Sequence, residues 1–294
     1  MSANATIPVY DIRAISRNEG RQDILVEALA RYVERHYQKL RWTHRHSFYH
    51  FVLFTKGSGH HLVDFVRYEV KPYQLYFMSP GQVHSWEFEG DTEGYLVHFE
   101  SRLFSSLLQD NTYLERFPFF TGEVSPVCQL SGDSGEKCVS LLAALLEEYE
   151  GRAPHRQHRI CLLLLEIFIL AHRSVDGLNV SAISGKDHDL LRRFRQLIEK
   201  HYKELRLPAE YAALLHVTAN HLNAVCRRFV DKTAGELIRD RVVLEAKRLL
   251  ANVSLRSNGI AGELNFSDNS YFSRFFKKST GQTPEEFRKN FINQ

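Results

Sequence analysis

The feature that most limits the fold of this chain is a pattern that occurs twice, with its copies fifty residues apart. In each copy a short helix-forming segment with a small residue leads through a tight connection into a capped amphipathic segment. The first copy contains "PAEYAALLHVT" and the second contains "SNGIAGELNFS"; Asn220 and Ser270 hold equivalent places. This arrangement is typical of a helix-turn-helix, so the sequence predicts two such units.

The second segment of each copy divides into two faces when it is placed on a helix at about 100° per residue. In residues 268–278 one face is aromatic and is expected to pack in the core: Tyr271, Phe272, Phe275 and Phe276. The opposite face is polar and cationic: Asn269, Ser270, Ser273, Arg274 and Lys277. Residues 218–229 divide in the same way, and their polar face carries Thr218, Asn220, Asn223, Ala224 and Arg227.

The rest of the C-terminal region is also expected to be helical. The predicted helices are 188–202, 208–215, 218–229, 234–251, 257–264, 268–278 and 284–291. Pro208 and Pro284 suit first-turn positions, and Thr218 and Ser267 suit helix caps. The helix between the two units has about 18 residues and would span about 27 Å. Because successive major grooves on one side of a duplex lie about 34 Å apart, two such helices could enter neighbouring grooves.

The polar faces carry residue types that suit DNA. Asn pairs with adenine, Arg with guanine, and Ala contacts a thymine methyl group, whereas Lys, Ser and Thr bind phosphates. Residues 185–294 hold 20 Lys and Arg against 13 Asp and Glu, a net charge of +7. The remaining residues hold 18 against 22, a net charge of −4. A basic region of this kind favours a polyanionic partner.

At these residues the chain resembles a known family. "GELNFSDNSYFSRFFKKSTGQTPEEFR" (262–288) is similar to the signature segment of AraC/XylS-type bacterial transcription regulators, and "VTANHLNAVCRRFVDKTAGELI" (217–238) is similar to their first helix-turn-helix unit. The resemblance implies two units joined by a long helix and bound to promoter DNA. The residues it places against bases are Asn220, Asn223, Ala224, Asn269, Ser270, Ser273 and Arg274. The chain departs from the family pattern at Ala224, Cys226 and Asp231, where Arg, Phe and Gly are common.

The first part of the chain has a different pattern. Short runs rich in β-forming residues, "FYHFVLF", "HLVDF", "QLYFM" and "GYLVHF", alternate with turn signals between residues 41 and 100. They predict an antiparallel barrel. Amphipathic segments within 135–172 predict two helices that pack on the barrel or form a dimer seam. One of them, "ICLLLLEIFILA" (160–171), is too short for a membrane span and carries Glu166, so a membrane association is not expected.

Histidines mark the interior of this predicted barrel. Strand alternation places Trp42, His44, His46, Phe48 and His50 on one face, and "SPGQVHSW" supplies His84 after a turn. This H-x-H strand followed by a P-G-x-x-H turn resembles a cupin, the sensor domain common in AraC-type regulators. The expected occupant is a small organic effector, with Tyr76 and Trp86 also lining its pocket. No metal or other cofactor is expected, although His44, His46, His50 and His84 are alternatives as ligands of Zn²⁺ or Fe²⁺.

The expected fold class is therefore α+β, in four parts. Residues 1–134 form the cupin-like sensing domain, 135–172 the paired helices, 173–187 a linker and 188–294 the double helix-turn-helix domain. The four cysteines form no C-x-x-C pair, and the N-terminus has no cationic and apolar export signal. Both observations favour the cytoplasm.

The leading functional prediction is an effector-responsive activator of transcription that is not an enzyme. Its expected partners are promoter DNA, a small-molecule effector, RNA polymerase and a second copy of the chain. One alternative is a metal-dependent cupin enzyme, an oxygenase or isomerase, with a helical appendage. Another is a regulator that needs no small molecule and uses its barrel only for dimerisation.

Overall fold

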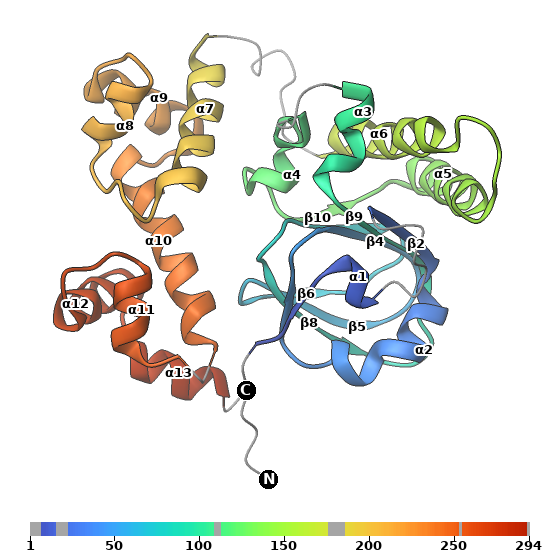
Figure 1. Cartoon of the computed structure of the whole chain (residues 1–294), viewed down its shortest axis with the longest axis horizontal. Helices are drawn as coiled ribbons and strands as arrows, with labels where there is room; N and C mark the ends of the chain where they lie inside the picture. The colour runs from blue at the N-terminus through green and yellow to red at the C-terminus, as the bar shows by residue number, and fades with distance from the viewer. Residues whose placement is uncertain (1–6, 16–22, 109–112, 176–185, 253–254, 293–294) are drawn as a thin grey trace. The chain divides into compact units, whose positions relative to one another are not determined.

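The chain forms two compact units. The computed structural model describes residues 7–15, 23–108, 113–175, 186–252 and 255–292. Its contacts separate an N-terminal unit (residues 8–177) from a C-terminal unit (residues 178–294). The first is rich in strands and the second is helical, so the predicted α+β class is confirmed (Figure 1). Most of the predicted linker, 173–187, lies outside the described residues.

The strands described in the N-terminal unit form two five-stranded sheets. The first sheet has the order β1 (Val9–Tyr10), β3 (His44–His46), β8 (Val83–Phe88), β5 (Gly59–Val63) and β6 (Val66–Glu69). The second has the order β10 (Val127–Gln129), β7 (Gln74–Met78), β4 (Tyr49–Lys56), β9 (Glu93–Phe99) and β2 (Ile24–Ala28). Neighbouring strands are antiparallel except for the parallel pair β1 and β3.

Helices accompany the sheets in the same unit. They are α1 (Ile12–Ile15), α2 (Leu29–Leu40), α3 (Ser105–Leu108), α4 (Pro118–Thr121), α5 (Gly132–Glu150) and α6 (Arg156–Ser174), with 3₁₀ turns at Ser101–Phe104 and Tyr113–Arg116. The segment "ICLLLLEIFILA" lies in α6, as the predicted helix does, but only one face of it is buried; Leu162 and Ile169 are exposed. Within the described residues, no helix combines the length and apolar character that a membrane crossing requires.

The second sheet is buried on both faces. Val52 and Phe54 of β4 belong to the core between the two sheets, together with Trp86 of β8. Phe51 and Leu53, which point the other way, belong to the core that α5 and α6 contribute. A strand covered on both faces forms a continuous apolar run, which is why "FYHFVLF" does not alternate. Of the two predicted roles of the paired helices, packing on the barrel is the one observed.

One predicted strand is too long. The run "HLVDF" was expected to be extended throughout, but β5 ends at Val63 and the next two residues form the turn into β6. Asp64 and Phe65 have φ angles of 45° and 72°, as a two-residue hairpin turn requires. The Asp64 carboxylate accepts hydrogen bonds from Gln82 Nε2 at 2.8 Å and from the Val83 backbone N–H at 3.2 Å. These bonds hold the turn against the start of β8.

The helices described in the C-terminal unit follow the prediction to within about two residues at each end. They are α7 (Lys186–His201), α8 (Pro208–Leu214), α9 (Ala219–Val230), α10 (Ala234–Leu250), α11 (Ser257–Glu263), α12 (Asn269–Thr280) and α13 (Pro284–Ile292). Thr218 caps α9 by accepting the His221 backbone N–H at 3.1 Å. The predicted cap Ser267 is wrong: Asp268 caps α12 and accepts the Tyr271 N–H at 2.7 Å.

Candidate nucleic-acid interface and histidine cluster

Helix α9 presents its predicted polar face to solvent. Four of the predicted contact residues are exposed: Thr218, Asn220, Ala224 and Arg227. Asn223 is half-buried, and its Oδ1 accepts the backbone N–H of Ala234 at 2.9 Å. This bond joins α9 to the start of α10 and leaves only the Asn223 amide NH₂ for a partner. The polar face borders a hollow in the surface that is lined by Pro208, Asn220, Asn223, Ala224, Arg227, Thr233 and Gly235.

Helix α12 presents the equivalent face. Ser270, Arg274 and Lys277 are exposed, whereas Asn269 and Ser273 are half-buried. Phe272 and Phe276 on the opposite side are fully buried. The Asp268 cap accepts backbone N–H groups at the helix start, chiefly that of Tyr271, and these bonds hold the pKa of its carboxyl below the usual value.

Tyr271 corrects the predicted core of α12. Its side chain is 51% exposed, although helical geometry put it on the aromatic side. Its ring lies 5.8 Å from that of Phe266, which is itself only half-buried, so Tyr271 stands at the edge of the core. A residue at the edge of an apolar face points to the same side of the helix as the core residues but stays partly in contact with solvent.

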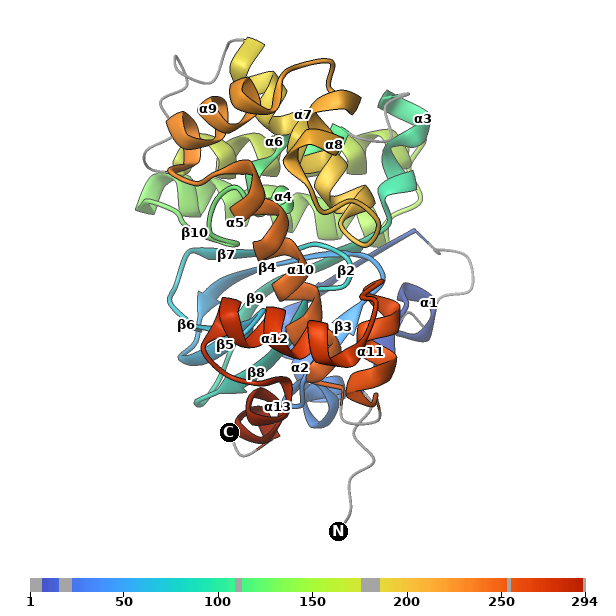
Figure 2. The ribbon, with the colours of Figure 1, turned by 90° about the vertical axis from the view of Figure 1, so that its left-hand side faces the viewer.

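The two helix-turn-helix units are held to one another by more than α10. This helix has 17 residues and is therefore about 25 Å long. Helices α8 and α9 lie at one end of it and α11 and α12 at the other (Figure 2). Arg206, just before α8, donates a hydrogen bond to the Leu264 carbonyl and places its guanidinium 4.8 Å from the Phe266 ring centroid. Lys203 pairs with Glu263 at 3.7 Å. No local pattern in the sequence predicts this bridge.

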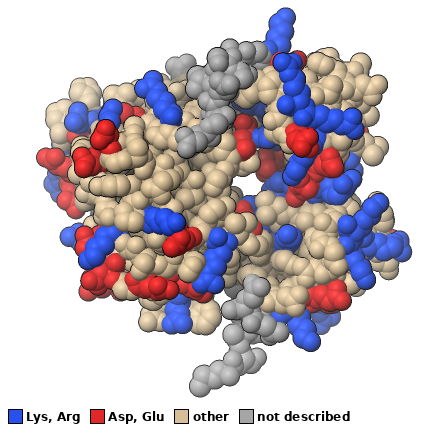
Figure 3. Space-filling view, turned by 180° about the vertical axis from the view of Figure 1, so that it is seen from behind, with Lys and Arg blue, Asp and Glu red and all other residues tan. Residues whose placement is uncertain are grey.

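Basic side chains gather over the C-terminal unit. On the face seen in Figure 3, Lys and Arg are conspicuous over this unit, with fewer Asp and Glu between them. Arg227, Arg274 and Lys277 contribute exposed cations from the two polar faces. Part of the cationic surplus of residues 185–294 therefore lies on α9 and α12, the helices that carry the candidate contacts.

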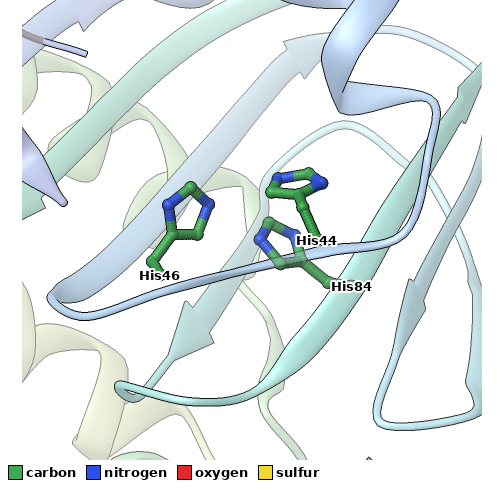
Figure 4. Close-up of side chains that lie close together, drawn as sticks. All are labelled: His44, His46 and His84. Carbon is green, nitrogen blue, oxygen red and sulfur yellow. The ribbon is translucent and has the colours of Figure 1, made fainter. Parts of the chain in front are cut away.

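A second group of candidate functional residues lies between the two sheets of the N-terminal unit. It contains six histidines, here called the histidine cluster: His44, His46, His50, His61, His84 and His98. All six side chains are at most 3% exposed. His44 and His84 are direct partners across β3 and β8, with ring centroids 4.1 Å apart, and His46 follows on the same face of β3 (Figure 4).

Burial sets the charge of this cluster. Desolvation lowers the pKa of His44 to about 4, against the hydrogen bond that it makes with the Trp42 carbonyl. Desolvation, with a smaller contribution from neighbouring imidazoles, holds the pKa of each of the other five well below 6.5. The six rings are therefore neutral at pH 7.

The remaining predicted pocket residues divide into three correct placements and one error. Phe48, Tyr76 and Trp86 are buried in the interior; Trp86 stacks on the His61 ring at 3.5 Å. The prediction that Trp42 faces the interior is wrong, because its side chain is 66% exposed. Strand β3 begins only at His44, so the alternation does not extend back to Trp42.

Two members of the histidine cluster were missed from the sequence. His61 belongs to β5 and His98 to β9, and alternation places each on the inner face of its strand. The signal was present in the predicted strands "HLVDF" and "GYLVHF". His98 reaches His46 and His50 through the pairing of β9 with β4, and His61 reaches His84 through the pairing of β5 with β8.

A strand-rich unit followed by a double helix-turn-helix unit is the architecture of a ligand-responsive transcription regulator. Comparisons with known proteins support this class. Residues 28–204 match the AraC-like ligand binding domain and residues 211–290 match a helix-turn-helix domain. Since the first match covers more than half of the chain, the protein belongs to the AraC family of transcription regulators. Neither match supports the enzyme alternative.

Several relatives resemble the chain over most of its length. The uncharacterized HTH-type transcriptional regulator YfiF of Bacillus subtilis is 24% identical over 263 residues, which cover 86% of this chain and 80% of that protein. The HTH-type transcriptional activator RhaR of Yersinia pestis is 23% identical over 287 residues, 93% of this chain and 94% of that protein. Among solved structures, ToxT of Vibrio cholerae aligns with 14% identity and a TM-score of 0.44, over 90% of this chain and 98% of that chain.

Proposed function

We propose that the chain activates transcription in the cytoplasm by binding promoter DNA with α9 and α12, and that an effector in the N-terminal unit controls this binding. The observation that carries the proposal is the pair of exposed polar faces held at the two ends of α10. Helix α10 and Arg206 fix the two faces relative to one another before DNA is met, which lowers the ordering cost of binding.

Base recognition is assigned to particular side chains. Arg274 is exposed in the middle of its face and carries a planar guanidinium that suits the O6 and N7 atoms of guanine. Lys277 and Arg227 lie nearer the C-terminal ends of their helices and suit phosphates. In α9, Asn220 and the free NH₂ of Asn223 suit acceptor atoms of a base, and the exposed Ala224 suits a thymine methyl group.

Control by an effector follows from population shift. An effector that binds the DNA-competent arrangement more tightly than the other arrangement increases the population of the DNA-competent one. The size of the shift is set by the ratio of the two affinities. A homodimer is part of the proposal. It is supported by Leu162 and Ile169 of α6, which are 58% and 39% exposed and, seven residues apart, share one side of the helix. Activation would then proceed through contact with RNA polymerase.

Replacing Arg274 with Ala tests the assignment of base contacts. We expect the variant to lose about 1–3 kcal/mol of binding to the preferred duplex and to discriminate less at one base pair. The preferred duplex is first obtained by selection from a random library with the purified chain. Binding is then measured by fluorescence anisotropy on that duplex and on its single-base variants.

Two further variants serve as controls. Lys277→Ala is expected to weaken binding equally on every duplex, as the loss of a phosphate contact does. Lys289→Ala removes an exposed cation from α13, a helix that carries neither polar face, and is expected to change affinity least. If Arg274→Ala weakens all duplexes equally, Arg274 binds phosphate and not a base. If the selection enriches no sequence at all, the proposed function is wrong.

A further inference from the structure

The histidine cluster contains far more unsatisfied polar atoms than a buried interior normally tolerates. Nine of its ring nitrogens are buried and have no hydrogen-bond partner among the residues that the structure describes: His44 Nε2, His46 Nδ1 and Nε2, His50 Nδ1 and Nε2, His61 Nδ1, His84 Nε2, and His98 Nδ1 and Nε2. Each such atom costs stability unless something binds it. Six imidazoles gathered at one place are therefore hard to explain as packing alone.

Three of the rings have the geometry of a ligand set. His44, His46 and His84 can each offer one nitrogen such that the three atoms lie within 4.8 Å of one another. Figure 4 shows these rings around a common space, two from β3 and one from β8. A tetrahedral ion with bonds of about 2.0–2.1 Å holds its ligand nitrogens about 3.3 Å apart. An ion would therefore draw the three nitrogens together by up to about 1.5 Å.

The hydrogen bond at Nδ1 of His44 leaves its Nε2 available to bind an ion. Its Nδ1 lies 2.8 Å from the Trp42 carbonyl oxygen, so Nδ1 carries the proton and donates it. The Nε2 lone pair then points into the cluster without a partner. Histidines that bind metals almost always donate their second N–H to a carbonyl, a carboxylate or water in this way.

His84 has the same arrangement with a different acceptor. Its Nδ1 lies 3.1 Å from Nε2 of His61. When His84 donates the Nδ1 proton to His61, its Nε2 lone pair is free for an ion. The stacking of His61 on Trp86 at 3.5 Å fixes the plane of the acceptor ring. His46, with neither nitrogen engaged, completes the set.

We propose that His44, His46 and His84 bind one divalent first-row transition metal ion, and that this ion is the effector to which DNA binding responds. Three imidazoles with no carboxylate or thiolate in the set favour Zn²⁺, Fe²⁺, Co²⁺, Ni²⁺ or Cu²⁺ over Mg²⁺ and Ca²⁺, which prefer oxygen ligands. The regulatory half of this inference rests on the function proposed above. The binding half does not.

Metal binding is measured first, without DNA. The full chain, without a histidine tag, is stripped with EDTA and titrated with Zn²⁺ by calorimetry and with Co²⁺ by visible absorption. We expect one ion per chain and a higher melting temperature of the N-terminal unit with Zn²⁺. His46→Leu and His84→Leu are expected to weaken binding at least 100-fold; His158→Ala, which removes an exposed imidazole, is expected to leave it unchanged.

The variants remain informative about folding. Leu replaces two unpaired buried nitrogens of His46 with apolar atoms, so the metal-free variant is expected to melt no lower than the metal-free parent chain. Absence of stoichiometric binding of Zn²⁺, Co²⁺, Ni²⁺ and Fe²⁺ by the folded parent chain overturns the proposal. Binding that survives in both folded Leu variants also overturns it, because the ion would then lie elsewhere.

DNA binding is measured second, on the selected duplex with and without the ion. We expect affinity to change by about 5- to 150-fold, and to change in the parent chain but not in His46→Leu. A chain that binds the ion and binds DNA equally in both states refutes the regulatory half alone. A chain that binds the ion but selects no duplex in either state contradicts the function proposed above and leaves the metal site standing.

Discussion

Between pH 7.5 and pH 5.0 the metal-free N-terminal unit is expected to lose most of its stability. The cause is the histidine cluster, whose six imidazoles are buried and neutral in the folded chain. An unfolded imidazole takes up a proton near pH 6.5, whereas burial lowers the pKa of His44 to about 4 and holds the other five well below 6.5. As the pH is lowered, the unfolded chain is therefore protonated and stabilised at pH values at which the folded chain is still unprotonated.

The sign and size of the effect follow from proton linkage. The contribution of the neutral imidazoles to the free energy of unfolding is fully present above pH 6.5 and is lost as the pH falls from 6.5 towards the folded pKa values. At pH 5 the His44 imidazole, whose pKa burial lowers to about 4, costs about 2 kcal/mol, and the other five act in the same direction. Whole domains have only about 5–15 kcal/mol of stability, so six costs of the same sign are expected to remove most of the stability of the unit.

Urea unfolding followed by tryptophan fluorescence measures this loss. Both tryptophans of the chain, Trp42 and Trp86, lie in the N-terminal unit, so their emission reports on that unit alone. EDTA is present throughout, and far-UV circular dichroism follows the helices separately. His50→Leu, outside the proposed metal ligands, removes one of these imidazoles and should reduce the pH dependence. Equal free energies of unfolding at pH 7.5 and pH 5.0 would show that the imidazoles are not buried as described.

DNA binding is expected to fall about 10³- to 10⁵-fold between 50 and 200 mM salt, the range for six to ten phosphate contacts. Each chain has exposed Arg227 and Lys277, which the proposal assigns to phosphates, and the exposed Lys278 beside the polar face of α12. Two chains in the proposed dimer reach the required number of contacts. The steepness arises because each phosphate contact releases a condensed counterion.

Anisotropy titrations at several KCl concentrations give this slope. Lys277→Ala should reduce the slope of log affinity against log salt by about 1 per chain in contact with DNA. The Lys289→Ala variant should leave the slope unchanged. A parent chain whose affinity barely depends on salt would not be binding through the basic faces of α9 and α12.

The C-terminal unit was largely predictable because its determinants are local. Apolar residues at helical spacing, first-turn prolines and a threonine cap place each helix within one or two residues, as Pro208 and Thr218 show. Local signals do not show how deeply a residue at the edge of a helix face is buried, so the prediction that Tyr271 packs in the core was wrong. Nor do they report contacts between units far apart in the sequence, so the bridge from Arg206 to Leu264 was not foreseen.

The N-terminal unit was predicted less completely because strands acquire their environment from distant partners. β2 pairs with β9, about seventy positions later in the chain, and neither β2 nor the following α2 was expected. Four of the six clustered histidines were found by alternation along one strand and one turn motif. His61 and His98 join them only through the pairing of β5 with β8 and of β9 with β4.

The central claim is that α9 and α12 read successive major grooves on one side of a duplex. Methylation interference on the selected duplex tests it most directly, because guanine N7 lies in the major groove. We expect each chain to give two groups of interfering positions about one helical turn, or 10 base pairs, apart, and Arg274→Ala to remove interference from one group only. A single group per chain, or two groups on opposite sides of the duplex, would contradict the account.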